Sequence, residues 1–165
     1  MSVDQWLFLI YIFYMTNITT FLLPMQPSDI VTCARIFADV YSNPPWDYHW
    51  VTVDKAEKYM CDIVEAVGFR GFLYYENETL TGFCVGAATD YFFGPQYEIK
   101  ECAVVPSRQR RGAGSRMLAI IEKKLAEDGV MNIYLHTSRT IPAHEFYIKN
   151  GYTPVSDNIY FMKEI

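Results

Sequence analysis

The spacing of apolar residues along the chain predicts two helices that follow a short first strand. Ile18 to Leu23 is a brief apolar run of the length of a strand. Ser28-Asp29 can then cap a helix in which apolar residues recur every three or four positions. Its expected buried face consists of Ile30, Cys33, Ala34, Phe37, Val40 and Tyr41. Thr52 can cap a second helix that Gly68 ends. The expected buried face of this second helix consists of Ala56, Tyr59, Met60, Ile63 and Val67.

The middle of the chain is typical of consecutive strands. Phe69–Glu76, Thr81–Thr89 and Tyr97–Val105 are rich in aromatic and β-branched residues. Asn77–Leu80 has the composition of a hairpin turn, and Gly94-Pro95 marks a second turn. We therefore expect three adjacent strands here.

Helices and strands alternate again toward the end. A helix is expected over Gly114–Glu127, where four residues share one apolar face. These are Met117, Leu118, Ile121 and Leu125. Met131–His136 is then a strand, a short helix runs from Pro142 to Gly151, and a strand pair is expected near Pro154 and Ile159–Lys163. The predicted order is β-α-α-β-β-β-α-β-α-β-β, an α+β fold with about seven strands and four helices.

Composition narrows the class of protein. A chain of 165 residues with 51% hydrophobic residues predicts one domain over residues 1–165. The net charge of -5 and the lack of a Lys/Arg-rich block argue against a nucleic-acid partner. The four cysteines form no CxxC pair, so we expect neither a metal site nor a disulfide framework, but reduced thiols in a cytoplasmic protein.

Residues 1–15 form an apolar extension whose role the sequence leaves open. The run Trp6–Met15 is shorter than the roughly 20 apolar residues that cross a bilayer. The first basic residue is Arg35, so the charged flank of a signal peptide is missing as well. Either the native chain starts at Met15, or the extension packs on the core or on a second subunit; a third interpretation makes it an anchor for a membrane or a partner. A membrane partner is not expected.

The most informative stretch for chemistry is a basic, glycine-bearing turn between a strand and a helix. Gly112 and Gly114 let the backbone approach a ligand closely, and the helix start offers unpaired N–H groups to an anion. Nearby cations add charge for phosphate; they are Arg108, Arg110 and Arg111. The alternative is a solvated basic turn. A dinucleotide-binding G-x-G-x-x-G is not matched, because Met117 stands at the third glycine position.

This turn resembles the signature Q/R-x-x-G-x-G/A of the GNAT superfamily of N-acetyltransferases. Gln109, Gly112 and Gly114 fill its three specified positions. A second stretch, Ala143–Tyr152, is similar to the A-x-x-F-Y-x-x-x-G-F/Y block of the same superfamily. The resemblance implies a mixed, mostly antiparallel central sheet, acetyl-CoA as co-substrate and no metal.

The resemblance also implies cofactor-binding residues. The pantetheine arm would pair with the backbone of the strand at Cys102, Ala103 and Val104. The pyrophosphate turn would include Gln109, Arg110, Arg111, Gly112, Ala113, Gly114 and Ser115. Thr140 stands where many members carry an asparagine that contacts the cofactor, and its hydroxyl could substitute.

Acetyl transfer to an amine needs a base for the amine and a proton donor for the leaving thiolate. The resemblance assigns the donor role to Tyr147, which would also contact the cofactor. Glu98 is the first choice for the base, on the strand face expected to carry Lys100, Cys102 and Val104. Glu101 is an alternative that reaches this side only if a bulge intervenes. His136, at the end of the next strand, is the other alternative.

The resemblance implies that the acceptor binds against the early helices and the aromatic loop Tyr41–Trp50, which could enclose a cation or a flat ring. The alternative is that this loop is a packed lid over the core. The predicted function is acetyl transfer from acetyl-CoA to a primary amine by direct attack in a ternary complex. The acceptor would be a small molecule, with a peptide amine as an open alternative, and a homodimer is also left open. The competing hypothesis is an inactive CoA-binding regulatory or structural module of the same fold.

Overall fold

One mixed sheet organises the computed structural model, which describes residues 10–11, 18–49, 51–159 and 161–165. Its six strands lie in chain order, with antiparallel neighbours from β1 to β5 and a parallel β5–β6 pair. The strands are β1 (Ile10–Tyr11), β2 (Thr20–Pro24), β3 (Phe69–Glu76), β4 (Thr79–Tyr91), β5 (Gly94–Val104) and β6 (Asn132–Leu135). Because β1 has only two residues, five strands carry the sheet.

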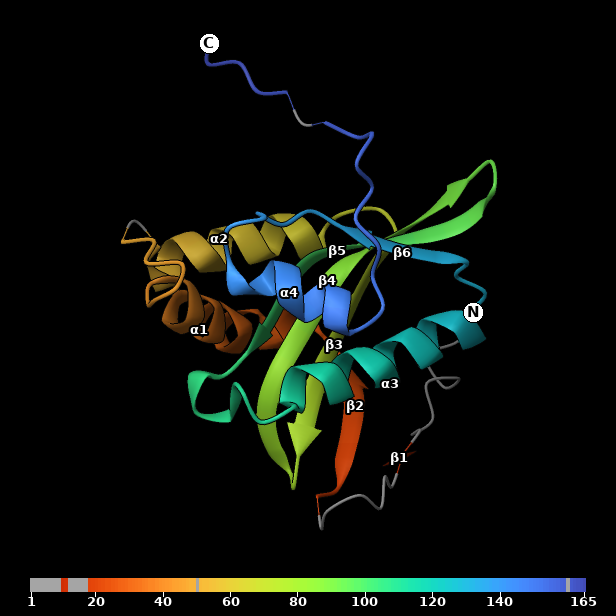
Figure 1. Cartoon of the computed structure of the whole chain (residues 1–165). Helices are drawn as coiled ribbons and strands as arrows, with labels where there is room; N and C mark the ends of the chain where they lie inside the picture. Colours follow the sequence, from red (N-terminus) through yellow and green to blue (C-terminus); the bar gives the residue numbers. More distant parts are fainter. Residues whose placement is uncertain (1–9, 12–17, 50, 160) are drawn as a thin grey trace.

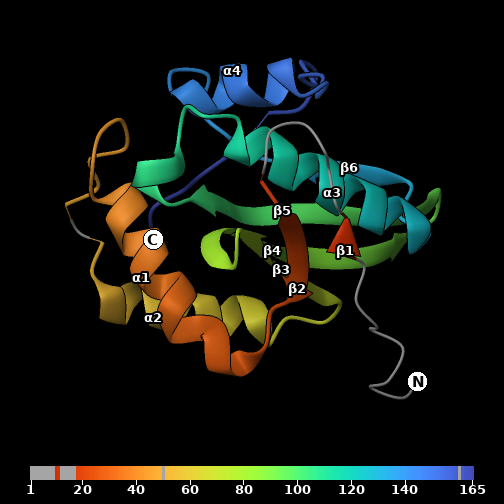
Figure 2. The same cartoon turned by 90° about the horizontal axis from the view of Figure 1, so that it is seen from below.

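Helices cover both faces of the sheet, two on each side (Figures 1 and 2). They are α1 (Ile30–Tyr41), α2 (Val53–Val64), α3 (Ala113–Glu127) and α4 (Pro142–Lys149). Helices α1 and α2 pack on one face around Met60 and Phe83. On the other face, α3 and α4 pack around Met117 and Tyr97. Side chains of β4 alternate between the two cores, as in any strand that is covered on both sides.

Local sequence explains why several elements begin and end where they do. Thr52 caps α2 by accepting a hydrogen bond from the Lys55 amide at 3.3 Å. Asn77 and Glu78 both have positive φ, as a two-residue hairpin turn requires, and so join β3 to β4. Helix α2 nevertheless ends at Val64, and Val67, expected on its buried face, is 97% exposed.

The predicted strand pair at the C-terminal end is wrong for the described residues. No strand follows α4 in the described part of the chain, where the expected pair near Pro154 and Ile159–Lys163 is irregular and exposed; Tyr160 lies outside it. Pro154 has no N–H for a ladder, which weakens the strand pattern at that point. The sheet therefore has fewer strands than the expected seven.

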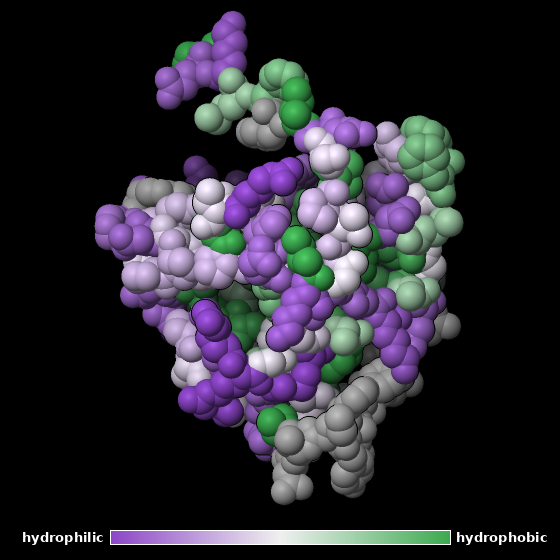
Figure 3. Space-filling view, in the orientation of Figure 1, coloured by the Kyte–Doolittle hydropathy of each residue, from purple (hydrophilic) through white to green (hydrophobic). Residues whose placement is uncertain are grey.

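The N-terminal extension mostly lies outside the described residues. Ile10–Tyr11 is the described exception, and it pairs antiparallel with Phe21 and Thr20 of β2. This short strand was not predicted. Elsewhere, apolar surface shows on the projecting β4–β5 hairpin and on the C-terminal segment, whereas much of the remaining visible face is hydrophilic (Figure 3).

Candidate functional site: an anion-binding turn beside a lined cavity

The turn between β5 and α3 is held in a shape that its sequence dictates. After a short 3-10 helix, Pro106–Arg108, the Gln109 side-chain amide donates to the Val104 carbonyl at 2.8 Å. Gly112 then adopts φ +78°, a left-handed conformation that suits glycine. This sharp reversal directs the chain into α3.

The turn offers positive groups to an anion. The first N–H groups of α3, at Ala113 and the next two residues, have no partner within the helix. The helix dipole adds partial positive charge at this end, and the exposed Arg110 and Arg111 add two full charges. A Cβ on Gly114 would lie 3.1 Å from the Phe146 ring, so this glycine allows α3 to pack closely on α4. The arrangement fits a phosphate-bearing ligand.

The strand before the turn has a free edge. Strand β6 pairs only with Gln96–Ile99 of β5, so the rest of this β5 edge has no strand partner in the described part of the chain. The Val105 amide donates to β4, and alternation turns the backbone groups of Val104 and Cys102 away from β4. The backbone groups of Cys102 and Val104 therefore point outward from this edge of β5. Ala103, also predicted to bind the pantetheine arm, faces β4 with its backbone groups.

A bulge in β5 decides which face its carboxylates occupy. The register against β4 shifts after Ile99, leaving Lys100 as an extra residue before Glu101. Glu98 and Glu101 therefore share the α1–α2 face, whereas Cys102 packs on the α3 side. The prediction that Glu98 shares a face with Cys102 and Val104 is wrong. It assumed that side chains alternate along β5 without a bulge.

A cavity of about 240 Å³ lies next to this bulge. Its lining comes from the loop after α1, the bulged segment of β5, the segment after β6 and the start of α4. Among these residues are Tyr41, Trp46, Glu101, Cys102, His136 and Tyr147. Glu101 and Tyr147, from elements far apart in the sequence, thus face the same space.

Glu101 is held on this wall by two phenols. Tyr41 and Tyr59 each donate a hydrogen bond to its carboxylate at 2.8 Å, one to each oxygen. Burial raises the pKa of Glu101 above its ordinary value, and the two tyrosine hydrogen bonds partly offset this rise. A partly buried carboxylate with a raised pKa is suited to accept a proton near neutral pH.

Tyr147 faces the cavity from α4. Burial, followed by the nearby Cys102 and Cys84 thiols, raises the pKa of its phenol. The hydroxyl therefore stays protonated at neutral pH and can donate a proton. Tyr147 is the residue that the sequence predicted as the acid.

The other predicted polar residues are placed less favourably. Glu98 is not part of the cavity lining; it pairs with Lys100 Nζ at 2.8 Å and lies 3.7 Å from His136 Nδ1. His136 does line the cavity, with 76% of its side chain exposed. Thr140 lies outside the lining, and its hydroxyl is engaged with Ser138 Oγ at 2.8 Å.

Sequence reasoning missed the two tyrosines that hold Glu101. Both were assigned to buried helix faces, and Tyr59 is in fact 38% exposed. Tyr41 also forms ring contacts with Trp46 and Tyr48, with centroids 5.3 and 6.3 Å apart, so the aromatic loop is anchored through it. The sequence did contain one signal for this role. A tyrosine on a packed face usually needs a polar partner for its hydroxyl.

Comparison with known proteins identifies the family. The acetyltransferase (GNAT) family matches residues 35–152, which include the C-terminal part of α1, the bulge, the turn and α4. The chain belongs to the GNAT family of acetyltransferases. This confirms the predicted family and enzyme class, an acetyl-CoA-dependent acyltransferase. No curated protein matches the chain.

Solved structures share this GNAT fold at low sequence identity. A possible acetyltransferase from Clostridium difficile 630 is similar with a TM-score of 0.74 and 12% identity, over 88% of this chain and 98% of that one. An aminoglycoside acetyltransferase, meta-AAC0020, from an uncultured soil metagenomic sample has a TM-score of 0.67 and 14% identity, over 88% and 96%. AAC(6')-Iy in complex with a bisubstrate analogue has a TM-score of 0.63 and 15% identity, over 88% and 99%.

The described residues include no helix with the length and apolarity that a membrane span needs. They also include no group of three or more His, Cys, Asp or Glu residues arranged to hold a metal ion. The described cysteines are all free thiols.

Proposed function

We propose that this GNAT protein transfers the acetyl group of acetyl-CoA to a primary amine by direct attack in a ternary complex. The observation that carries the proposal is that Glu101 and Tyr147 face one cavity, beside the free edge of β5. Acetyl-CoA supplies an activated acetyl group as a thioester. The backbone groups of Cys102 and Val104, on the edge of β5 that has no strand partner among the described residues, would bind its pantetheine arm, and the turn Gln109–Ser115 its pyrophosphate.

The two ionisable groups have complementary roles in this proposal. Glu101 accepts a proton from the bound ammonium group, directly or through one water, so that the neutral amine can attack. Tyr147 donates its phenolic proton to the departing sulfur, and the second proton that the acylated nitrogen loses restores the phenol. Glu101 then releases its proton to solvent. Glu101 replaces Glu98 as our first choice of base, because Glu101 lines the cavity and its carboxylate has a raised pKa.

The acceptor side of the cavity favours a small cationic amine. Tyr41, Trp46 and Tyr48 contribute aromatic surface next to the Glu101 carboxylate, a combination that attracts and orients an ammonium group. The structurally similar meta-AAC0020 is named as an aminoglycoside acetyltransferase, which supports testing polycationic amino sugars as acceptors.

The direct test is release of free thiol from acetyl-CoA in the presence of amines. A panel of aminoglycosides, polyamines and peptides should contain at least one acceptor that gives turnover, with mass spectrometry of the product as confirmation. Tight binding of CoA without turnover on any amine would instead support the inactive CoA-binding module. Absence of CoA binding would contradict both.

A further inference from the structure

An ion pair between a buried carboxylate and a partly exposed arginine lies directly beneath the turn that follows β5. Glu76, at the end of β3, is 2% exposed, and Arg116 lies in the first turn of α3. Arg116 donates to Glu76 Oε1 from Nε at 3.1 Å and from Nη2 at 2.6 Å. The Tyr74 hydroxyl donates to the same oxygen at 2.8 Å. The Arg116 side chain is thereby fixed at both of these nitrogens.

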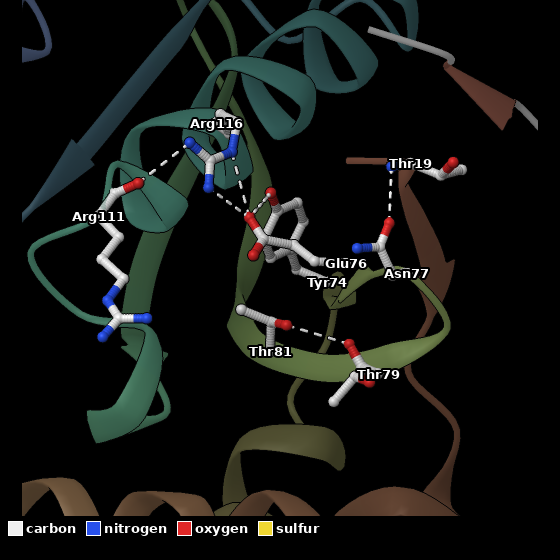
Figure 4. Close-up of polar contacts among 8 residues, drawn as sticks. All are labelled: Thr19, Tyr74, Glu76, Asn77, Thr79, Thr81, Arg111 and Arg116. Carbon is white, nitrogen blue, oxygen red and sulfur yellow. Dashed lines mark hydrogen bonds and ion pairs between the residues drawn. The ribbon is translucent and has the colours of Figure 1, made fainter. Parts of the chain in front are cut away.

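The third nitrogen of Arg116 reaches the turn itself. Nη1 donates to the Arg111 carbonyl oxygen at 3.2 Å, while the Arg111 side chain points away from the pair (Figure 4). In a trans peptide the C=O and N–H groups point in opposite directions. Holding the Arg111 carbonyl toward Arg116 therefore directs the Gly112 amide away from Arg116.

We propose that Arg116, anchored by Glu76, is a positioning residue that presets the Gly112 amide for the pyrophosphate of CoA. The inference rests on the proposed function, because it assumes that the turn binds this pyrophosphate. Glu76 neutralises the Arg116 charge, so the contribution of Arg116 comes through the backbone of the turn and not from a charge presented to the ligand.

The glycine at position 112 fits this arrangement. A Cβ there would lie 2.9 Å from Arg116 Nη1, closer than side chains normally approach. Gly112 thus allows both the left-handed backbone and the close approach of the guanidinium group. Lysine at position 116 could still pair with Glu76, but a single ammonium group cannot reproduce the three-nitrogen bridge.

The test compares CoA with pantetheine, which has the same arm without nucleotide or phosphates. Dissociation constants are measured by calorimetry for the wild type, Arg116→Met, Arg116→Lys and Glu76→Gln. Loss of one preset hydrogen bond to a charged ligand should weaken CoA binding by about tenfold in each variant. Pantetheine affinity should not change, whereas general damage to the fold would lower both.

Two controls complete the experiment. Lys123→Met removes a positive charge from an exposed position of the same helix and should leave CoA affinity unchanged. Because Arg116→Met leaves Glu76 buried without its cation, thermal melting is followed for every variant, and Arg116→Lys serves if Arg116→Met fails to fold.

Each result has a distinct meaning. Wild-type affinity for CoA in Arg116→Lys would overturn the inference, as would equal weakening of CoA and pantetheine. If Glu76→Gln binds CoA more tightly, Arg116 acts as a direct phosphate ligand and the positioning role is wrong. Failure of the wild type to bind CoA would instead contradict the proposed function.

Discussion

The turn after β5 and the cavity beside the β5 bulge are neighbours on one strand, but they depend on the sequence in different ways. The turn is one continuous segment, Gln109–Ser115, shaped by a side-chain bond from Gln109 and by Gly112. The cavity is assembled from four separated segments and depends on a register shift at Lys100. Local rules can therefore predict the turn, whereas the cavity needs the folded sheet.

The largest effect is expected at the turn. Gly112→Glu forces a left-handed backbone on a residue with a side chain and places a negative charge where the pyrophosphate is proposed to bind. CoA affinity should fall by roughly 10³-fold. Calorimetry with CoA measures the change, and Gly112→Ala, which has the strain without the charge, should lose less. Unchanged affinity in Gly112→Glu would contradict the site assignment.

The next largest effect is expected at Tyr147, the proposed acid on the α4 side of the cavity. Tyr147→Phe removes the phenolic proton but keeps the ring, so kcat should fall by about 10²-fold with little change in the KM for acetyl-CoA. Tyr152→Phe removes a hydroxyl from the neighbouring ring, 5.3 Å away between centroids, and serves as the matched control. Equal kcat values in Tyr147→Phe and the control would exclude Tyr147 as the acid.

The two carboxylates of β5 provide the sharpest comparison within the cavity. Glu101→Gln should lower kcat/KM by about 10²-fold, because an amide cannot accept the amine proton. Glu98→Gln should lower it far less, since Glu98 does not line the cavity and is paired with Lys100. The opposite ranking would restore Glu98 as the base and contradict the role that the bulge gives to Glu101.

These residues also show how far the sequence alone could lead. Helix faces, the β3–β4 hairpin and the glycine turn follow from local spacing, so α1, α3 and β3 were predicted within a few residues of their bounds. The extra residue at Lys100 has no local signature, because it arises from pairing with β4. The partners of Glu101 lie 60 and 42 positions away, at Tyr41 and Tyr59, and only the packed fold brings them together.

The last prediction concerns the pH at which Glu101 loses its proton and can act as the base. The Tyr59 hydroxyl donates to the charged form of Glu101, which lowers the pKa of the carboxyl against the opposing effect of burial. Tyr59→Phe removes this donor and leaves the ring in place, so the pKa of Glu101 should rise. Because the base must be deprotonated, the acid limb of the kcat/KM profile should move to higher pH.

The control for this shift is Tyr48→Phe, which keeps the aromatic ring of the loop and leaves both Glu101 hydrogen bonds intact. Its acid limb should coincide with that of the wild type. An acid limb that stays in place in Tyr59→Phe would mean that another group titrates in the profile. A move to lower pH would contradict the sign of the interaction, because removal of a donor to a carboxylate cannot stabilise its charged form.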